Sequence, residues 1–209
     1  MKIGLLGGSF DPIHNGHLHM AKSAYEEYQL DEVWLIPSGH APHKEEDKMS
    51  SANHRYKMCE LAVKMDSFLK VSRIEIDAPE TSYTYRTLQK LTDLYPMHEF
   101  YFIMGGDSID YFDKWVHPEI ISSLCTILVL GRNEIHEREI EKKIRELSLL
   151  FPCKIQLIHN RLYPTSSTEI RTMLSNGEIN HQKEIADIPK EVLEYIKSNR
   201  LYQYNTEAL

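Results

Sequence analysis

Two patterns of apolar and polar residues follow one another along the chain. Short runs rich in β-branched and aromatic residues have the character of strands, and they cover residues 2–6, 33–37, 70–76, 99–104, 126–131 and 154–159. Stretches with helical periodicity separate them, at 16–29, 52–64, 85–94, 118–124 and 134–150. This alternation predicts an α/β protein whose mostly parallel sheet is covered by helices on both faces.

Right-handed crossovers favour a Rossmann-like, doubly wound sheet with strand order 3-2-1-4-5, to which the run at 154–159 could add a sixth strand. The 209 residues fit a single domain over 1–209, with a small helical part from about 165 onward. Its last helix has Pro189 in the first turn. Ligands of such sheets bind beyond the carboxyl ends of the strands, so we expect the site there.

The first of those ends carries the segment GGSFDPIHNGH at residues 7–17. Glycines allow a ligand to approach the backbone closely, and the start of the next helix directs N–H groups at an anion. Asn15 is the expected N-cap of that helix, which puts His17 in its first turn and His14 just before it. A plain βα turn with an incidental His pair is the simpler alternative. The coincidence of turn, helix start and two imidazoles favours a phosphate site.

A second polar segment, TSSTEIR at residues 165–171, opens a later helix. Ser166 and Glu169 have the spacing of a capping box, which explains the hydroxyl and the carboxylate without any ligand. It does not explain Arg171, one turn into the helix and beside the same positive helix end.

Further polar turns follow strands or precede helices. A loop at 38–48 carries His40, His43 and Lys44, and it is a candidate lid. The four histidines His14, His17, His40 and His43 could alternatively bind zinc or copper, although no carboxylate is patterned with them. The segment Ser82–Tyr83–Thr84 opens a helix, with Ser82 or Thr84 as its N-cap, and its N–H groups would suit a carboxylate.

The fourth strand ends at Gly105, and Asp107 follows in the position where such folds hold ribose hydroxyls. Tyr111 and Trp115 come next; each is a core residue or a stacking surface for a ring. Arg132 follows the fifth strand.

Composition narrows the range of partners. A formal net charge of −7 argues against nucleic acid as the main partner, because phosphate-backbone binding needs clustered cations. No apolar run has membrane-spanning length, and the chain opens directly into a strand, so neither a membrane nor a leader sequence is expected. Three scattered cysteines indicate a reduced protein of the cytoplasm. The oligomeric state stays open, with a homo-oligomer among the alternatives.

The two signatures together resemble the nucleotidyltransferase superfamily of adenylyl- and cytidylyltransferases, whose marks are His-x-Gly-His and a later Ser-Ser-Thr-x-Ile-Arg. The longer string at 7–17 is similar to one branch, the bacterial nicotinate-nucleotide adenylyltransferases. The resemblance implies transfer of an adenylyl group from ATP, with Mg²⁺, to nicotinate mononucleotide. Its implied catalytic residues are His14, His17, Lys44 and Arg171.

The same resemblance implies two binding sets. ATP would contact Gly7, Gly8, Ser9, Phe10, Gly16, Gly105, Asp107, Ser167 and Thr168. Nicotinate mononucleotide would contact Lys44, Ser82, Tyr83, Thr84, Tyr111, Trp115 and Arg132, with Lys44 serving either phosphate. The chain has Gly106 where the family usually has Ala, and Asn133 where it often has Pro. A sister enzyme such as a pantetheine-phosphate adenylyltransferase, or a nucleotide sensor without activity, is the alternative.

Overall fold

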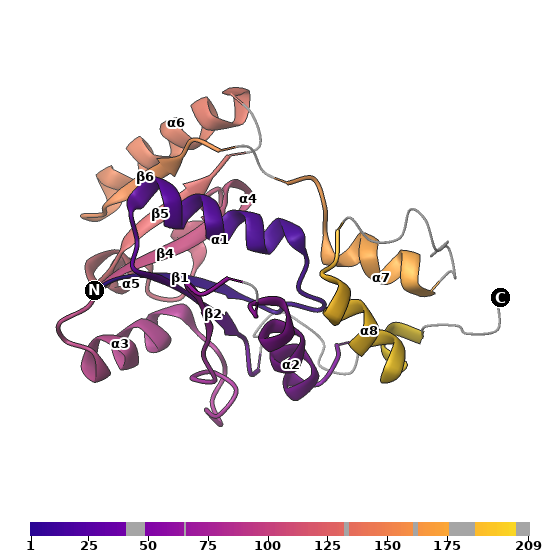
Figure 1. The fold of residues 1–209 in the computed structure, drawn as a ribbon. Helices are drawn as coiled ribbons and strands as arrows, with labels where there is room; N and C mark the ends of the chain where they lie inside the picture. Colours follow the sequence, from indigo (N-terminus) through magenta and orange to yellow (C-terminus); the bar gives the residue numbers. More distant parts are fainter. Residues whose placement is uncertain (41–48, 65, 132–133, 161–162, 176–186, 204–209) are drawn as a thin grey trace.

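A parallel β-sheet forms the centre of the computed structural model (Figure 1), which describes residues 1–40, 49–64, 66–131, 134–160, 163–175 and 187–203. Its six strands are β1 (Lys2–Gly8), β2 (Glu32–Pro37), β3 (Leu69–Val71), β4 (Glu99–Gly105), β5 (Thr126–Leu130) and β6 (Ile155–Ile158). All neighbours pair in parallel, in the order β3-β2-β1-β4-β5-β6. The predicted Rossmann-like order is confirmed, and the sixth strand is present.

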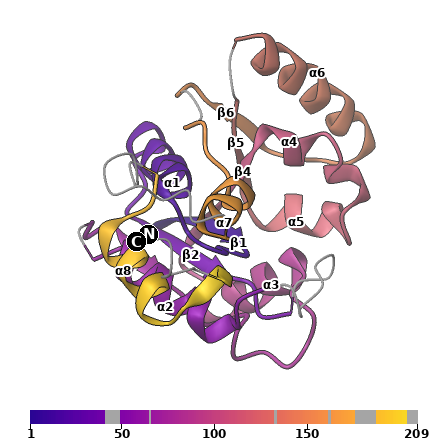
Figure 2. The ribbon, with the colours of Figure 1, turned by 90° about the vertical axis from the view of Figure 1, so that its right-hand side faces the viewer.

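Helices cover both faces of this sheet. They are α1 (Asn15–Tyr28), α2 (Ala52–Ala62), α3 (Thr84–Leu94), α4 (Gly106–Ile109), α5 (Pro118–Leu124), α6 (Glu134–Leu150), α7 (Ser167–Ser175) and α8 (Lys190–Ser198), with short 3₁₀ turns η2 (Phe112–Lys114) and η3 (Leu201–Gln203). Viewed from the side opposite the N-terminus, α1, α2 and α8 lie on one side of the sheet, and α3, α5 and α6 lie on the other (Figure 2).

The strands supply both layers of core because successive side chains point to opposite faces. In β5, Ile127 and Val129 pack into a cluster with residues of α3, α5 and α6, whereas Leu128 and Leu130 pack into a cluster with residues of α1 and α2. All four side chains are fully buried. A strand buried on both faces must be apolar throughout, which is why residues 127–130 show no polar alternation.

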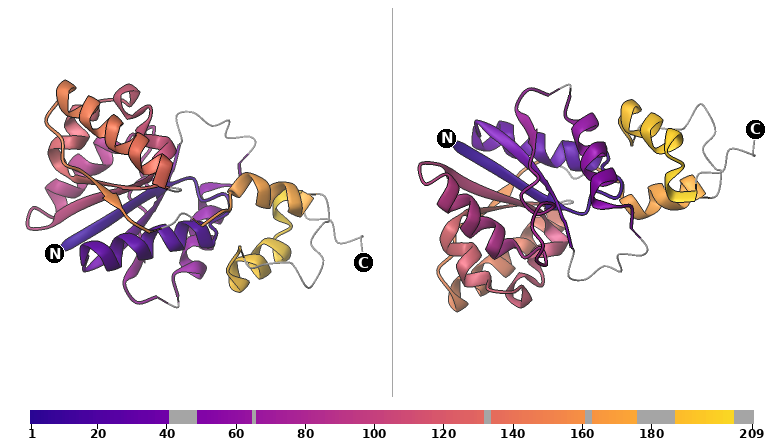
Figure 3. Two further views of the ribbon diagram at one scale, coloured as in Figure 1. Left: turned by 90° about the horizontal axis from the view of Figure 1, so that it is seen from above. Right: turned by 90° about the horizontal axis from the view of Figure 1, so that it is seen from below.

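The last helices, α7 and α8, lie at the end of the molecule away from the N-terminus (Figures 1 and 3). Val192, Leu193 and Ile196 of α8 are buried in the same apolar cluster as Met58 and Cys59 of α2. This packing holds the C-terminal part against the helix layer formed by α1 and α2.

Some predicted boundaries were wrong. The third strand ends at Val71 instead of 76, because the chain then coils into a turn in which the Asp77 N–H donates to the Arg73 carbonyl, 2.9 Å away. Pro189 is the N-cap of α8, with non-helical backbone angles, so it lies just outside the first turn.

Cys59 and Cys125 are buried free thiols. Burial raises the pKa of both, that of Cys125 to about 12, which makes them inert core residues.

Tyr202 in η3 ties the end of the chain to the loop after β1. Its hydroxyl donates to Asp11 Oδ1 over 2.6 Å, and Asp11 is only 2% exposed. We expect Tyr202→Phe to lower the free energy of unfolding by about 1–3 kcal/mol, because a buried carboxylate loses a donor. Urea unfolding of the variant tests this, with Tyr95→Phe at an exposed tyrosine as the control. Equal stability of all three proteins would contradict it.

Candidate active site

The turn between β1 and α1 is the centre of the site, and it is buried. Phe10 and Ile13 are 1% and 0% exposed. Phe10 has a left-handed backbone, with φ of 49°, which L-residues other than Gly and Asn seldom adopt. Its ring meets the His17 ring edge-on, with centroids 4.9 Å apart. The buried Phe10 ring therefore contacts His17, and its burial offsets the cost of the unusual backbone angle.

His14 and His17 form a stacked pair with ring centroids 3.7 Å apart. The expectation that Asn15 is the N-cap of α1 was wrong: His14 is the N-cap and Asn15 is the first helical residue. The Asn15 N–H instead donates to the Asp187 carbonyl over 2.8 Å, which ties α1 to the segment before α8.

One hydrogen bond sets the tautomer of His17. The His14 backbone N–H donates to His17 Nδ1 over 3.3 Å, so Nδ1 carries a lone pair. In the neutral ring the proton is then on Nε2, which makes Nε2 a donor.

His14 is in a different environment. It is 5% exposed, and burial lowers its pKa from 6.5 to about 4, although the charges of Asp187 and Glu169 act in the opposite direction. The ring is therefore neutral at pH 7. Gly16 leaves room for this ring: a Cβ there would be 3.0 Å from both Cε1 and Nδ1 of His14, so a larger residue would have to displace the imidazole.

The second signature segment packs directly on the first. Arg171 donates from Nη1 to the Asp11 carbonyl over 2.7 Å and from Nη2 to Thr168 Oγ1 over 3.2 Å. The Ser167 hydroxyl donates to the Pro12 carbonyl over 2.9 Å. Ser167 and Arg171 therefore bind the loop that follows β1, although they are 155 and 160 positions away from their partners in the sequence.

The predicted capping box at the start of α7 is also present. The Glu169 N–H donates to Ser166 Oγ over 3.2 Å, and the Ser166 N–H donates to Glu169 Oε2 over 3.1 Å. Ser166 and Glu169 therefore have a structural role as helix caps. Ser167 and Arg171 bind the loop after β1, and with Thr168 they lie where a ligand could bind.

A cavity of about 640 Å³ lies beside the start of α3. The structure brings together here five residues predicted for one ligand: Ser82, Tyr83, Thr84, Tyr111 and Trp115. Lys114, Val116 and Ile121 complete the lining and were missed from the sequence. In the sequence, the position of Lys114 next to Trp115 was the signal that could have identified Lys114 as a lining residue.

The start of α3 differs from the expectation in one respect. Tyr83 is its N-cap and makes no side-chain capping bond, so neither Ser82 nor Thr84 caps the helix. The Ser82 hydroxyl instead accepts the Gly39 N–H over 3.0 Å. Because α3 begins at Thr84 and its first bonds run from the Arg86 and Thr87 N–H groups to the Tyr83 carbonyl, the N–H groups of Thr84 and Tyr85 have no acceptor inside the helix. This end of the cavity therefore suits a negative group.

Gly105 and Asp107 lie where β4 passes into α4, with Asp107 in the first turn of that helix. Since β4 pairs in parallel with β1, its carboxyl end is at the same sheet edge as Gly7 and Gly8. A Cβ at Gly105 would make an ordinary van der Waals contact with Met20 Cε of α1, at 3.8 Å.

Lys44, His43 and Arg132 lie outside the described residues, so their predicted roles stay predictions. Across the described ranges, no group of three or more His, Cys, Asp or Glu side chains is placed to hold a metal ion, and the four-histidine alternative gains no support. No described helix combines the length and the apolar character needed to cross a membrane.

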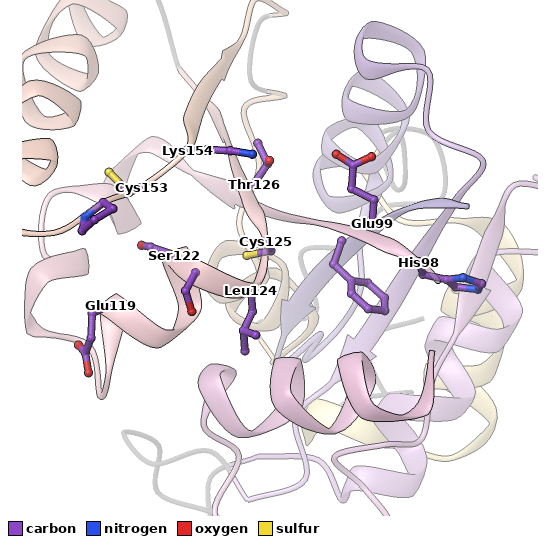
Figure 4. Close-up of a pocket in the computed structure, with 12 residues that line it drawn as sticks. His98, Glu99, Glu119, Ser122, Leu124, Cys125, Thr126, Cys153 and Lys154 are labelled. Atoms are coloured by element: carbon purple, nitrogen blue, oxygen red, sulfur yellow. The ribbon is translucent and has the colours of Figure 1, made fainter. Parts of the chain in front are cut away.

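A second cavity, of about 570 Å³, lies at the amino ends of β4, β5 and β6 (Figure 4). Its lining includes Glu99, Thr126 and Lys154, which begin or immediately precede these strands. This edge of the sheet is opposite the carboxyl ends that carry Gly8 and Gly105. The two cavities share no lining residue.

Comparison with known proteins agrees with this geometry. The family model described as cytidylyltransferase-like matches residues 5–173. The chain belongs to the cytidylyltransferase-like family. Among its curated relatives, a protein of Clostridium botulinum strain Okra is 35% identical over 201 residues, covering 95% of this chain and 98% of the relative, and is described as a probable nicotinate-nucleotide adenylyltransferase. One of Lachnoclostridium phytofermentans with the same description is 36% identical over 177 residues, or 85% of this chain and 88% of the relative.

A solved structure is similar to this chain over 99% of its length. It is the nicotinic acid mononucleotide adenylyltransferase of Plasmodium falciparum complexed with NaAD, with a TM-score of 0.78, 25% sequence identity and coverage of 99% of both chains.

The lowered pKa of His14 makes a prediction about stability. In the unfolded chain His14 binds a proton near pH 6.5, whereas in the folded protein its lowered pKa delays protonation until about pH 4. The free energy of unfolding therefore falls as the pH drops through this window. The loss attributable to His14 is about 3 kcal/mol when the whole window has been crossed. Urea unfolding of wild type and His14→Asn at pH 7 and pH 4.5 measures it.

Carboxylates titrate in the same range, so the test compares the two proteins at each pH. Wild type should lose more stability on acidification than His14→Asn. A His19→Asn variant, at a partly exposed position of the same helix, serves as the control and should behave like wild type. Parallel losses in wild type and His14→Asn would show that His14 does not resist protonation.

Proposed function

We propose that this enzyme transfers the adenylyl group of ATP to nicotinate mononucleotide, giving nicotinate adenine dinucleotide and pyrophosphate. One observation carries the proposal most strongly. Both signature segments meet on a single buried loop, and a cavity lined by Ser82–Thr84, Tyr111 and Trp115 lies at the start of α3. The family membership and the descriptions of the relatives support it.

The reaction needs no protein nucleophile, because the acceptor phosphate is already an anion. The enzyme must align that phosphate with the α-phosphorus and stabilise the charge that develops on the transferring and leaving groups. His17 can stabilise the charge on the transferring group, because Nδ1 accepts the His14 N–H and Nε2 is therefore the donor. We assign His17 Nε2 to the α-phosphate.

The β- and γ-phosphates fit the start of α7. Ser167 and Thr168 offer main-chain N–H groups there, and Arg171 adds a fixed positive charge held by Asp11 and Thr168. His14 contributes a neutral imidazole. Asp107 at the end of β4 is assigned to the adenosine ribose, and Gly7, Gly8, Ser9, Phe10, Gly16 and Gly105 to the surface along which ATP lies.

Mg²⁺ is the metal that we propose to accompany ATP. The described residues form no cluster of carboxylates and imidazoles able to enclose a cation, so phosphate oxygens and water would supply most of its ligands. The ion would add positive charge at the leaving pyrophosphate.

The cavity at the start of α3 is assigned to the pyridine ring and its carboxylate. Trp115 is anchored against the core by the rings of Phe102 and Phe112, at centroid distances of 6.0 Å and 5.4 Å, so it can present a rigid stacking surface. Helix N–H groups at Thr84 and Tyr85 favour the carboxylate. Lys114, exposed and on the same cavity, adds a positive charge. Lys44 and Arg132 are proposed for the acceptor phosphate.

This pocket predicts a strong preference for nicotinate over nicotinamide mononucleotide. The amide NH₂ would face helix N–H donors, and a site built for one hydrogen-bonding group can reject its analogue strongly. We expect kcat/KM to differ by about 10²–10⁴-fold. Pyrophosphate release with each mononucleotide, at equal ATP and Mg²⁺, measures the ratio; 4′-phosphopantetheine in the same assay tests the sister activity. Equal values, or preference for the amide, would contradict the assignment of Ser82–Thr84.

The assignment of His17 makes a separate prediction. His17→Ala should lower kcat by about 10²–10³-fold, because it removes a donor that matters most as charge develops. The KM for ATP should change much less. His19→Ala, two residues along α1, is the matched control and should keep full activity. Wild-type kcat in His17→Ala would exclude His17 from the mechanism.

A further inference from the structure

Arg55 is a buried cation to which no role has been assigned. It is 2% exposed and lies on the apolar face of α2, in helical register with Met58, Cys59 and Ala62. Burying a guanidinium is costly unless its donors are satisfied. Its side chain makes five hydrogen bonds, four of them to main-chain carbonyls.

These bonds join the ends of two strands. Nη1 donates to the Ser9 carbonyl over 2.8 Å, in the loop after β1. Nη2 donates to the carbonyls of Ser38 and Gly39 over 2.6 Å and 3.3 Å, just after β2, and Nε donates to the Ser50 carbonyl over 3.0 Å. A single planar group therefore joins the loop after β1 to the segment after β2, beyond the last main-chain bond between the two strands, from the Ser38 N–H to the Gly8 carbonyl.

The segment after β2 is in turn fixed to the turn at the start of α3. The Gly39 N–H donates to Ser82 Oγ over 3.0 Å, and the Ser82 N–H donates to the His40 carbonyl over 2.9 Å. A Cβ at Gly39 would be 2.2 Å from the Glu75 carbonyl oxygen, so these chains are in direct contact.

The Glu75 side chain strengthens the same junction. It accepts the Thr87 hydroxyl over 2.7 Å. Burial raises the pKa of its carboxyl, opposed by hydrogen bonds from Thr87 and Ser82 and by the positive charge of Arg55. A continuous chain of contacts thus runs from Ser9 through Arg55 and Gly39 to Ser82.

We propose that Arg55 is a positioning residue that fixes the separation between the ATP loop and the pyridine turn. The inference rests on the proposed function, because it takes Ser9 and Ser82 to belong to the two substrate sites. Adenylyl transfer requires the acceptor phosphate in line with the α-phosphorus, and a displacement of about 1 Å can cost about 10²-fold in rate. Binding of either substrate alone needs no such alignment.

Lysine cannot replace Arg55 in this role. Its single ammonium keeps the charge but cannot reach carbonyls on two strands in the fixed geometry of a guanidinium fork. Arg55→Lys should lower kcat by about 10–100-fold while the KM for ATP and for nicotinate mononucleotide each change less than about threefold. Binding of each substrate alone, followed by tryptophan fluorescence, should be unchanged.

Arg73→Lys is the matched control. Arg73 is exposed and pairs with Asp77 over 2.9 Å, so its replacement should leave both kcat and KM at wild-type values. Thermal unfolding gives the folded fraction of each variant, and kcat is expressed per folded molecule. A purely structural role for Arg55 would lower the folded fraction and leave that corrected kcat unchanged.

Gly39→Ala tests the other link of the chain with Arg55 intact, and it provides the test if Arg55→Lys does not fold. It should likewise lower kcat more than it changes either KM. Corrected kcat values within twofold of wild type in the folded variants would overturn the proposal, as would a rise in one KM at unchanged kcat. An inactive wild type would instead contradict the proposed function and, with it, the reaction that Arg55 is proposed to serve.

Discussion

The site depends on the burial of one polar loop, the turn from Ser9 to Ile13. Buried main-chain carbonyls must find donors, and helix or sheet partners are not available in a turn. Here the donors are side chains from distant elements: Arg55 of α2 for Ser9, Arg171 of α7 for Asp11, and Ser167 of α7 for Pro12. Oδ1 of the Asp11 carboxylate accepts from the Tyr202 hydroxyl and from the Ser50 N–H. The loop is thus hydrogen-bonded to α2, to α7 and to η3.

This arrangement explains why two signatures about 150 residues apart belong together. Arg171 satisfies the loop that carries His14 and His17, and the same guanidinium is held at the start of α7 where phosphates would lie. The C-terminal helices are therefore part of the site. A neutral, buried His14 beside His17 avoids placing two positive imidazoles 3.7 Å apart. In the proposed function, fixed positive charge comes from Arg171, and the histidines act as oriented donors.

Much of this could be predicted from the sequence, because the relevant signals are local. Strand and helix periodicity located the strands, and right-handed crossovers predicted the order 3-2-1-4-5 with a possible sixth strand; the place of β6 beside β5 came from the structure. The glycine turn and the capping box marked both helix starts. The grouping of Ser82–Thr84 with Tyr111 and Trp115 around one cavity came from the resemblance. Arg55 and Tyr202 were missed because their partners are main-chain or carboxylate oxygens far away in the chain. The predicted N-cap of α1 was wrong by one residue. The Asn15 N–H donates to the Asp187 carbonyl, a long-range contact that no local pattern predicts.

The sequence did contain one signal for Arg55. It is a charged residue in helical register with the buried, apolar Met58, Cys59 and Ala62. A cation at such a position indicates a buried network. Its acceptors could be identified only once the sheet order had brought the ends of β1 and β2 together.

Isotope transfer tests the central claim most directly. With nicotinate mononucleotide and Mg²⁺, label from [α-³²P]ATP should appear in the dinucleotide, and label from [γ-³²P]ATP should appear only in pyrophosphate. This outcome requires the acceptor phosphate to attack the α-phosphorus, which is where His17 is assigned. Transfer of the γ-label to the mononucleotide, or no incorporation of the α-label, would contradict the account.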